Sequence, residues 1–510
     1  MKQRLAILGS TGSIGVQTLD IVRENPDFFE VRVLTANSNW QRLAAQAREF
    51  DADTAVIADK RYYTRLRDAL EDTDVKVYAG EEAVAQVAAG GDTDVAVNAL
   101  VGYAGLAPTV AALGAGKKLA LANKESLVVG GEYVMRLAAE KRAPILPIDS
   151  EHSAIFQCLA GEQSPVRRLI ITCSGGALRD LKREELAGVT AEQALRHPQW
   201  EMGAKITIDS STLVNKGFEV IEAHWLFGTP AEKISVVLHP QSIVHSMVEF
   251  EDGAIKAQLG TPDMRMPISL ALMYPRRANR PGERFDFLKH PQLTFAEVDR
   301  VKYPALDIAY DCLRRRGTAA CTMNGANEVA VAAFLGGRCA WLDIVRAIEH
   351  ALNRASFAAA PTLADYAAAD AALAAVGAQA LAERDLQALS GGERQKVFLA
   401  MALAQDAPTI LLDEPTTYLD IDRQFEVMRL LAELRAQGKT VVAVLHDLSL
   451  AFHFADRVVL LRAGTIEADG TPDAVANSGA LARAFRVAAH RIEVPGFGAQ
   501  YVFYPLDRPL

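Results

Sequence analysis

A glycine-rich turn near the start of the chain constrains the fold more than any other feature of the sequence. Gly9, Gly12 and Gly15 follow an apolar, strand-like run at residues 4–8 and precede a helical pattern at residues 16–23. Glycines permit a tight turn and a close approach of the backbone to a ligand, and the following helix offers unpaired N–H groups and the positive end of its dipole. This placement predicts the first βαβ unit of a dinucleotide-binding domain.

Strand and helix patterns then alternate up to residue 148. Further strand-like runs lie at residues 29–34, 54–58, 75–78, 95–99, 118–122 and 145–148, separated by alanine-rich helical segments. Such alternation predicts a parallel, doubly wound sheet. We therefore expect an α/β, Rossmann-like domain over residues 1–148.

The end of the second strand bears on the choice of dinucleotide. An NAD-binding domain commonly places an acid here for the ribose 2′-hydroxyl, whereas this chain has Thr35, Ala36, Asn37, Ser38 and Asn39. The missing acid favours NADP.

Length, charge and cysteine usage limit the class of protein. The 510 residues are enough for about three or four domains, and the net charge of −9 argues against a nucleic-acid partner. The five cysteines are scattered without a C-x-x-C pair, which favours a reducing cytoplasm over a zinc or redox role. The chain opens directly into a strand pattern and has no apolar run of ~18 residues, so we expect neither a signal peptide nor a membrane span.

An acidic segment follows the run at residues 145–148. Because side chains alternate along an extended chain, Asp149 and Glu151 would point the same way from a strand. Glu219 is the candidate third carboxylate, and three oxygen ligands with room for water and substrate suit Mg²⁺ or Mn²⁺ better than zinc. On spacing alone, a solvated loop or an ion-paired surface is the commoner meaning of such a pair.

Polar residues also follow the strand pattern at residues 118–122. Asn123, Lys124, Glu125 and Ser126 would lie at the carboxyl edge of the sheet, where open α/β folds bind ligands. A lysine beside a glutamate is otherwise usually a surface pair. Both alternatives stay open here.

With these motifs the sequence closely resembles the 1-deoxy-D-xylulose 5-phosphate reductoisomerase family, NADPH- and metal-dependent enzymes of non-mevalonate isoprenoid synthesis. The resemblance continues downstream over residues 1–385. Residues 173–177 resemble the start of the family's mobile active-site loop, and residues 196–203 resemble the flap that closes over substrate. Residues 209–219 resemble the segment that supplies phosphate ligands and the last metal carboxylate.

The resemblance implies conversion of 1-deoxy-D-xylulose 5-phosphate to 2-C-methyl-D-erythritol 4-phosphate, with a role for each matching residue. The implied metal ligands are Asp149, Glu151 and Glu219. The implied catalytic residues are these three with Lys124 and His197. The implied substrate contacts are Lys124, Ser150, Glu151, Ser174, His197, Ser210, Asn215, Lys216 and Glu219, of which Ser174, Ser210, Asn215 and Lys216 would hold the phosphate. The implied NADPH contacts are Thr11, Gly12, Ser13, Ile14, Ala36, Asn37, Asn39, Asn123, Glu125 and Gly203.

Two further details follow from the resemblance. Trp200 and Met202 would form an apolar lid that excludes water from the reaction. The family often has a basic residue where this chain has Asn37 and Ser38, so these two residues are expected only as neighbours of the ribose.

The resemblance also implies the domain order and a homodimer. A catalytic, metal-binding and dimerisation domain of the α+β type is expected at residues 149–290, with an open sheet built from strands at 234–238, 246–249 and 254–260. A helical bundle that includes the segment 323–328 is expected at residues 291–385. His239, His245 and His350 lack acidic companions at ligand spacing, so we expect them to be structural.

The remaining residues, 386–510, resemble the C-terminal part of an ABC-transporter ATPase. Residues 389–395 resemble the signature motif, residues 409–415 a Walker B strand with Glu414 as its catalytic acid, residues 418–420 the D-loop and His446 the switch histidine. The sequence contains no G-x-x-x-x-G-K-[ST] motif to hold ATP phosphates. Gly438-Lys439-Thr440 does not replace it, because Glu433 stands where the leading glycine belongs and a strand pattern follows.

Two function classes therefore compete. One is an oxidoreductase and isomerase with an inert appended fragment. The other is a transport-coupled ATPase or regulatory module that offers its signature motif to another subunit. Only the first has every motif that it needs, so we favour it and regard a transporter partner as doubtful.

Overall fold

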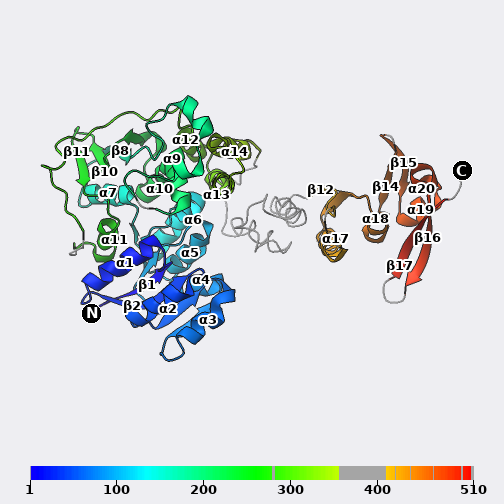
Figure 1. Ribbon diagram of the computed structural model, residues 1–510, viewed down its shortest axis with the longest axis horizontal. Helices are drawn as coiled ribbons and strands as arrows, with labels where there is room; N and C mark the ends of the chain where they lie inside the picture. Colours follow the sequence, from blue (N-terminus) through cyan, green and yellow to red (C-terminus); the bar gives the residue numbers. More distant parts are fainter. Residues whose placement is uncertain are drawn as a thin grey trace. The chain divides into compact units, whose positions relative to one another are not determined.

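The computed structural model describes residues 2–200, 202–277, 282–354, 409–417, 419, 421–436, 438–462, 464–494 and 498–506. The chain divides into two compact units, Met1–Leu363 and Ala364–Leu510. Figure 1 colours the first unit from blue to yellow-green and the second from brown to red.

A seven-stranded parallel sheet begins the first unit, in the order β4-β3-β2-β1-β5-β6-β7. Its strands are β1 Gln3–Leu8, β2 Phe29–Ala36, β3 Thr54–Ile57, β4 Lys76–Ala79, β5 Val95–Asn98, β6 Lys118–Leu121 and β7 Ile145–Pro147. The predicted Rossmann-like sheet is confirmed. Strand order reverses at β1, so the carboxyl ends of β1 and β5 border the crevice where such sheets bind ligands.

Helices cover this sheet (Figure 1). They are α1 Ser13–Glu24, α2 Trp40–Glu49, η1 Lys60–Tyr62, α3 Tyr63–Ala69, α4 Glu81–Ala89, η2 Tyr103–Gly105, α5 Leu106–Gly114 and α6 Glu125–Lys141. A helix from much later in the chain, α11 Arg265–Met273, also packs here: its Ile268 and Leu272 belong to the same buried cluster as Leu5 and Ile7. The first apolar core is thus completed by a segment beyond residue 148.

A second, four-stranded sheet has the order β11-β10-β8-β9. Its strands are β8 Val166–Cys173, β9 Ile234–Leu238, β10 Val244–Phe250 and β11 Ile255–Leu259. β8 and β9 are parallel, whereas β10 runs antiparallel to β8 and β11 antiparallel to β10. The three strands predicted for an open sheet in this region are confirmed.

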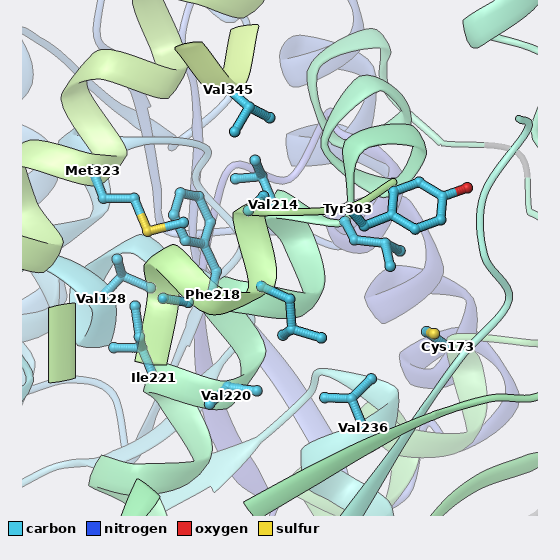
Figure 2. Packing of buried hydrophobic residues seen from close by; sticks show 14 of the residues in the cluster. Val128, Cys173, Val214, Phe218, Val220, Ile221, Val236, Tyr303, Met323 and Val345 are labelled. Atoms are coloured by element: carbon cyan, nitrogen blue, oxygen red, sulfur yellow. The ribbon is translucent and has the colours of Figure 1, made fainter. Parts of the chain in front are cut away.

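The helices around this sheet form one core with the C-terminal helices of the unit. They are α7 Ser150–Leu159, η3 Arg183–Gly188, α8 Ala191–Ala194, α9 Ala204–Thr212, α10 Val214–Phe227, η4 Ala231–Lys233, α12 Ala305–Arg315, α13 Ala319–Leu335 and α14 Trp341–Arg354. Figure 2 shows Phe218 and Ile221 of α10 packed against Val128 of α6 and Met323 of α13. A Cβ on Gly217 would lie 2.9 Å from the Ala309 Cβ of α12, so only glycine allows this close contact. α10 is therefore fixed between neighbouring helices while its other face is left for polar residues.

The second unit contains three two-stranded sheets among its described residues. They pair β12 Thr409–Asp413 with β13 Thr440–Val444, β14 Val458–Arg462 with β15 Thr465–Gly470, and β16 Val487–Val494 with β17 Gly498–Pro505. The helices are α17 Ile421–Ala436, α18 Leu448–Phe454, α19 Pro472–Asn477 and α20 Ala480–Phe485.

One face of β12 and β13 packs on α17 through Ile410, Val427 and Leu431. On the other face Leu411 is 74% exposed and Val444 is 51% exposed. The triplet 438–440 leads into β13, so the expected strand after it is confirmed. The signature-like segment 389–395, Tyr418 and Asp420 lie outside the described residues, as does the expected helical segment from 355 to 380. In the part of the chain that the structure describes, no helix is both long and apolar enough to cross a membrane.

Candidate active site

Three carboxylates converge next to the carboxyl end of β7. Asp149, Glu151 and Glu219 each place an oxygen within 4.8 Å of the others. The strand-based reason for pairing the first two is wrong, because β7 ends at Pro147 and α7 begins at Ser150. Asp149 is the N-cap of α7 and accepts a hydrogen bond from the Glu151 N–H at 3.2 Å. The cap and the first helical turn, rather than strand alternation, bring the two acids together.

Two lysines hold this cluster. Lys124 Nζ lies 2.9 Å from Asp149 Oδ2 and 3.4 Å from Glu219 Oε1, and donates to Asn215 Oδ1 at 2.7 Å. Lys216 Nζ lies 2.9 Å from Glu151 Oε1 and 2.5 Å from Glu219 Oε2. Because Lys216 and Glu219 are buried and three acids face two ammonium groups, the cluster carries an excess of negative charge.

The pKa values reflect that excess. Burial, and then the repulsion from Glu151, raise the pKa of Glu219 to about 7. Burial opposes ionisation of Asp149 too, but Lys124 and then His152 outweigh it and hold the pKa of that carboxyl well below its usual range. A set of three oxygen donors whose mutual repulsion is only partly neutralised fits a divalent cation.

His152 and Glu222 are two further titratable residues in contact with this cluster, and neither was predicted from the sequence. His152 Nδ1 lies 3.0 Å from Asp149 Oδ1 and 3.4 Å from Glu222 Oε2. His152 Nε2 lies 2.9 Å from the backbone carbonyl oxygen of Glu219, so one ring contacts two of the three acidic positions. A spacing of three residues on a helix, from Asp149 and from Glu219, is the only sequence signal for this pair.

A serine and a histidine come together beside the acids. Ser174 Oγ lies 3.1 Å from His197 Nε2. His197 Nδ1 accepts the backbone N–H groups of Gln199 at 3.2 Å and Trp200 at 3.0 Å, so the ring proton of neutral His197 sits on Nε2 and points to Ser174. Burial, and then the Arg179 guanidinium, lower the pKa of His197 to about 4, so the ring is neutral near pH 7.

The loop that carries Ser174 is fixed from two sides. A Cβ on Gly176 would lie 2.6 Å from the carbonyl oxygen of Ser210 in α9, so the loop lies directly on that helix. Lys302, also missed by the sequence analysis, is buried and donates to the carbonyl oxygens of Leu178, Arg179 and Leu181 at 2.8, 2.8 and 2.6 Å.

The flap lies over this region, except for Glu201, which is outside the described residues. The Trp200 ring is half-buried, and its centroid is 6.5 Å from that of His245. Met202 is also half-buried. These two side chains are therefore partly exposed and do not belong to the apolar core.

The glycine-rich turn forms a cradle that fits a dinucleotide. Gly9 has φ +83°, and a Cβ on it would lie 2.8 Å from the Ala99 carbonyl oxygen. A Cβ on Gly15 would lie 2.3 Å from the Gly9 carbonyl oxygen. Gly12 is the N-cap of α1 and supplies no side-chain cap, so the first N–H groups of the helix, around Ser13 and Ile14, are left for another acceptor. The close turn and the uncapped helix end match the needs of a pyrophosphate.

Asn123 and Glu125 connect the turn after β5 to the start of α9, which follows the flap. Asn123 Nδ2 donates to the carbonyl oxygens of Leu100 at 3.0 Å and Gly102 at 2.9 Å, and to Glu125 Oε2 at 3.2 Å. Lys205, two residues after Gly203, lies 3.1 Å from Glu125 Oε1 and 2.9 Å from Asp209 Oδ2. The first turn of α9, which follows the flap, is thus ion-paired to Glu125.

The expected residues therefore fall into two adjacent groups. Lys124, Asp149, Ser150, Glu151, Asn215, Lys216 and Glu219 gather around the acids, and Ser174, His197 and Ser210 around the loop. Thr11, Ala36, Asn37 and Asn39 lie at the carboxyl ends of β1 and β2. A Rossmann-like sheet with a phosphate cradle beside a buried acid–lysine cluster defines a class: nucleotide-dependent enzymes that use a divalent cation.

Comparisons with known proteins identify the family. The profile of 1-deoxy-D-xylulose 5-phosphate reductoisomerase matches residues 5–131, that of its C-terminal domain residues 145–227, and the DXP reductoisomerase C-terminal domain residues 259–376. The 1-deoxy-D-xylulose 5-phosphate reductoisomerase of Bacteroides fragilis is 54% identical over 371 residues, which cover 72% of this chain and 96% of the relative. That of Chlorobium chlorochromatii is 53% identical over 350 residues, or 68% of this chain and 92% of the relative.

Solved structures support the same family. The Zymomonas mobilis enzyme in complex with NADPH is 40% identical, with a TM-score of 0.68 over 80% of this chain and 100% of that chain. A DOX-P reductoisomerase in complex with NADPH, fosmidomycin and magnesium is 37% identical, with a TM-score of 0.67 over 79% of this chain and 98% of that chain. The chain belongs to the 1-deoxy-D-xylulose 5-phosphate reductoisomerase family.

Proposed function

We propose that this chain rearranges and reduces 1-deoxy-D-xylulose 5-phosphate to 2-C-methyl-D-erythritol 4-phosphate, with NADPH and Mg²⁺ or Mn²⁺. The observation that carries the proposal is the convergence of Asp149, Glu151 and Glu219, clamped by Lys124 and Lys216, beside a dinucleotide cradle. Family membership supplies the reaction, and the relatives solved with NADPH and magnesium support the cofactors.

The acids and lysines have complementary roles in this proposal. Asp149, Glu151 and Glu219 would hold the divalent cation, which would supply Lewis-acid stabilisation of negative charge on the substrate. Lys124 keeps Asp149 ionised and in place, and Lys124 and Ser150 together contact the substrate beside the acids. His152 and Glu222 orient Asp149 from behind.

The phosphate is held by residues of the cluster and of the neighbouring loop and helix. Ser174, Ser210, Asn215 and Lys216 supply hydroxyl, amide and ammonium donors. His197 donates its Nε2 proton to the substrate as a neutral ring, since its pKa of about 4 keeps it uncharged near neutral pH. When the flap closes, Trp200 and Met202 exclude water from the reacting carbon.

In this proposal the cofactor binds in the cradle formed by the glycine-rich turn. The backbone around Thr11, Gly12, Ser13 and Ile14 binds the pyrophosphate at the start of α1. Ala36, Asn37 and Asn39 border the adenosine ribose, and Asn123, Glu125 and Gly203 line the path between adenosine and the flap. NADPH bound in this cradle would supply the hydride for the reduction.

The direct test is NADPH oxidation by the full chain with 1-deoxy-D-xylulose 5-phosphate, followed by mass spectrometry of the product. Turnover should vanish with EDTA and return with Mg²⁺ or Mn²⁺. Turnover that persists after complete removal of divalent cations would contradict the proposed role of the acids.

We also propose a homodimer in the cytoplasm. β11 is an edge strand of the second sheet with Ile255 53% exposed, and an unpaired apolar edge favours a partner strand or surface. All five cysteines are free thiols, as suits a reducing compartment. Light scattering of the full chain at two concentrations tests the dimer, and a monomer mass at both would contradict it.

The second unit is not proposed to act as an ATPase. Its Glu414 and His446 come together, with 2.5 Å between Glu414 Oε1 and His446 Nε2, but the sequence offers no motif to hold triphosphate beside them.

A further inference from the structure

A buried lysine just before α12 contacts the loop that carries Ser174. Lys302 is 6% exposed, and its Nζ donates to the carbonyl oxygens of Leu178, Arg179 and Leu181 at 2.8, 2.8 and 2.6 Å. An ammonium group has three N–H donors, so these three acceptors use all of them. Lys302 therefore has no donor left for a ligand, and its effect on the reaction must pass through the loop.

The three acceptors belong to one turn of the loop, in which the Leu181 N–H donates to the Leu178 carbonyl oxygen at 3.1 Å. Carbonyl oxygens that converge on one point repel one another, and buried carbonyls without a donor are costly in free energy. The ammonium group relieves both effects, because it places a positive charge and three donors at the point of convergence. The conformation of the turn at 178–181 thus depends on Lys302.

The turn reaches Ser174 through Arg179. The Arg179 carbonyl oxygen accepts from Lys302, and the Arg179 Nη1 donates to the Ser174 carbonyl oxygen at 3.2 Å. Ser174 Oγ in turn lies 3.1 Å from His197 Nε2. A displacement of the turn would therefore move the backbone of a residue that is expected to hold phosphate.

A second anchor, Tyr303, follows directly in the chain. Its hydroxyl donates to the Gly175 carbonyl oxygen at 3.3 Å. Gly175 and Gly176 have φ of +83° and +67°, a conformation that favours glycine, and the Gly176 N–H donates to Ser174 Oγ at 3.2 Å. Figure 2 shows Tyr303 in the same buried cluster as Cys173, the residue before Ser174. This anchor thus stands on the apolar core.

We propose that Lys302 is a positioning residue, which sets Ser174 in place for the sugar phosphate before the flap closes. The inference rests on the proposed function, in which Ser174 contacts the phosphate. A hydroxyl that is oriented in advance need not be ordered when the substrate binds, so affinity is gained. NADPH binding should not depend on Lys302, because the cradle is built on the first sheet.

The test is the Kd for 1-deoxy-D-xylulose 5-phosphate, measured by calorimetry on the full chain with Mg²⁺ and without NADPH. In Lys302→Met we expect this Kd to rise about 10-fold or more, while the Kd for NADPH stays within about twofold. Lys302→Arg keeps the charge and several donors, so it should recover most of the affinity. Lys118→Met is the matched control and should change neither Kd, because Lys118, at the start of β6, donates to a different backbone carbonyl oxygen, that of Leu272, at 2.9 Å.

A double-mutant cycle separates positioning from general support of the fold. If Lys302 acts through Ser174, the two substitutions share one effect, so Lys302→Met should change the Kd by less than about twofold in a Ser174→Ala background. A lysine that merely stabilises the fold would instead weaken binding by the same factor in both backgrounds. If Lys302→Met does not fold, Tyr303→Phe takes its place in the cycle, since it removes only the hydroxyl that donates to Gly175 and should raise the Kd about 2- to 10-fold.

Three results would overturn the inference. They are an unchanged Kd for the sugar phosphate in Lys302→Met, equal losses for the sugar phosphate and NADPH, or equal losses with and without the Ser174 hydroxyl. Failure of the proposed function is seen separately, because a parent chain that binds the sugar phosphate through Ser174 but does not reduce it with NADPH would overturn only that function. A parent chain that does not bind the sugar phosphate would overturn both.

Discussion

The two units differ in how their acidic motifs are supported. In the first unit the Glu219 side chain is only 2% exposed. It contacts three polar side chains, those of Lys124, Asn215 and Lys216. In the second unit Glu414 is 39% exposed and its partner His446 is 76% exposed. Both regions keep residues of a recognisable motif. Among the residues that the structure describes, only the first unit surrounds them with the charges and neighbouring elements that a chemical step requires.

The difference extends to the sheets that carry the motifs. β7 lies at the end of a seven-stranded sheet, and the helix after it packs against a second sheet. β12 and β13 form a pair whose outer face leaves Leu411 and Val444 exposed. A motif therefore predicts function only when the surrounding fold can hold its ligand, and the predictions below test that contrast.

The largest expected effect is in the acid cluster. Glu219→Gln should reduce turnover by about 10²- to 10³-fold or more, because it removes a carboxylate ligand whose contribution belongs to the transition state. The measurement is kcat for NADPH oxidation at saturating Mg²⁺, with thermal unfolding to verify the fold. Glu251→Gln, an exposed acid 3.7 Å from Lys233, is the control. Near-normal turnover in Glu219→Gln would remove this residue from the site.

A smaller effect is expected at the flap. Trp200→Ala should raise KM for 1-deoxy-D-xylulose 5-phosphate about 10- to 100-fold, because the closed flap loses its largest apolar side chain. The Kd for NADPH without substrate should stay within about twofold, since the indole lies beside His245 of the second sheet. Tyr78→Ala, which removes a 47% exposed aromatic residue of β4, is the control. Equal losses for both ligands would instead indicate a general folding defect.

No effect is expected from the acid of the second unit. Glu414→Gln should leave NADPH-dependent turnover unchanged, and phosphate release from ATP should be undetectable before and after the substitution. The physical reason is that Glu414 can position water only against a triphosphate that another element holds. ATP hydrolysis by the parent chain that disappears in Glu414→Gln would give the second unit a function of its own.

The sequence predicts most of the fold because its signals there are local. The strands of the first sheet follow from apolar runs separated by helical segments, and Gly9 and Gly15 identify the cradle that their missing side chains make possible. The start of α7 was predicted less well. Asp149 is a favourable N-cap residue, yet the apolar run before it suggested that the strand continued.

What could not be predicted depends on contacts between distant segments. Arg42 meets the carbonyl of Thr11, Lys205 meets Glu125, and Lys302 meets the loop at 178–181 only after the chain has folded. None of these pairs has a periodic spacing that a sequence pattern could reveal.

The most direct test of the central claim is the activity of a chain ended at Leu386 beside that of the full chain. If the chemistry belongs wholly to the first unit, kcat and KM for NADPH-dependent reduction of 1-deoxy-D-xylulose 5-phosphate should agree within about twofold. A large loss of reductase activity on truncation, with the shortened chain still folded, would contradict the account.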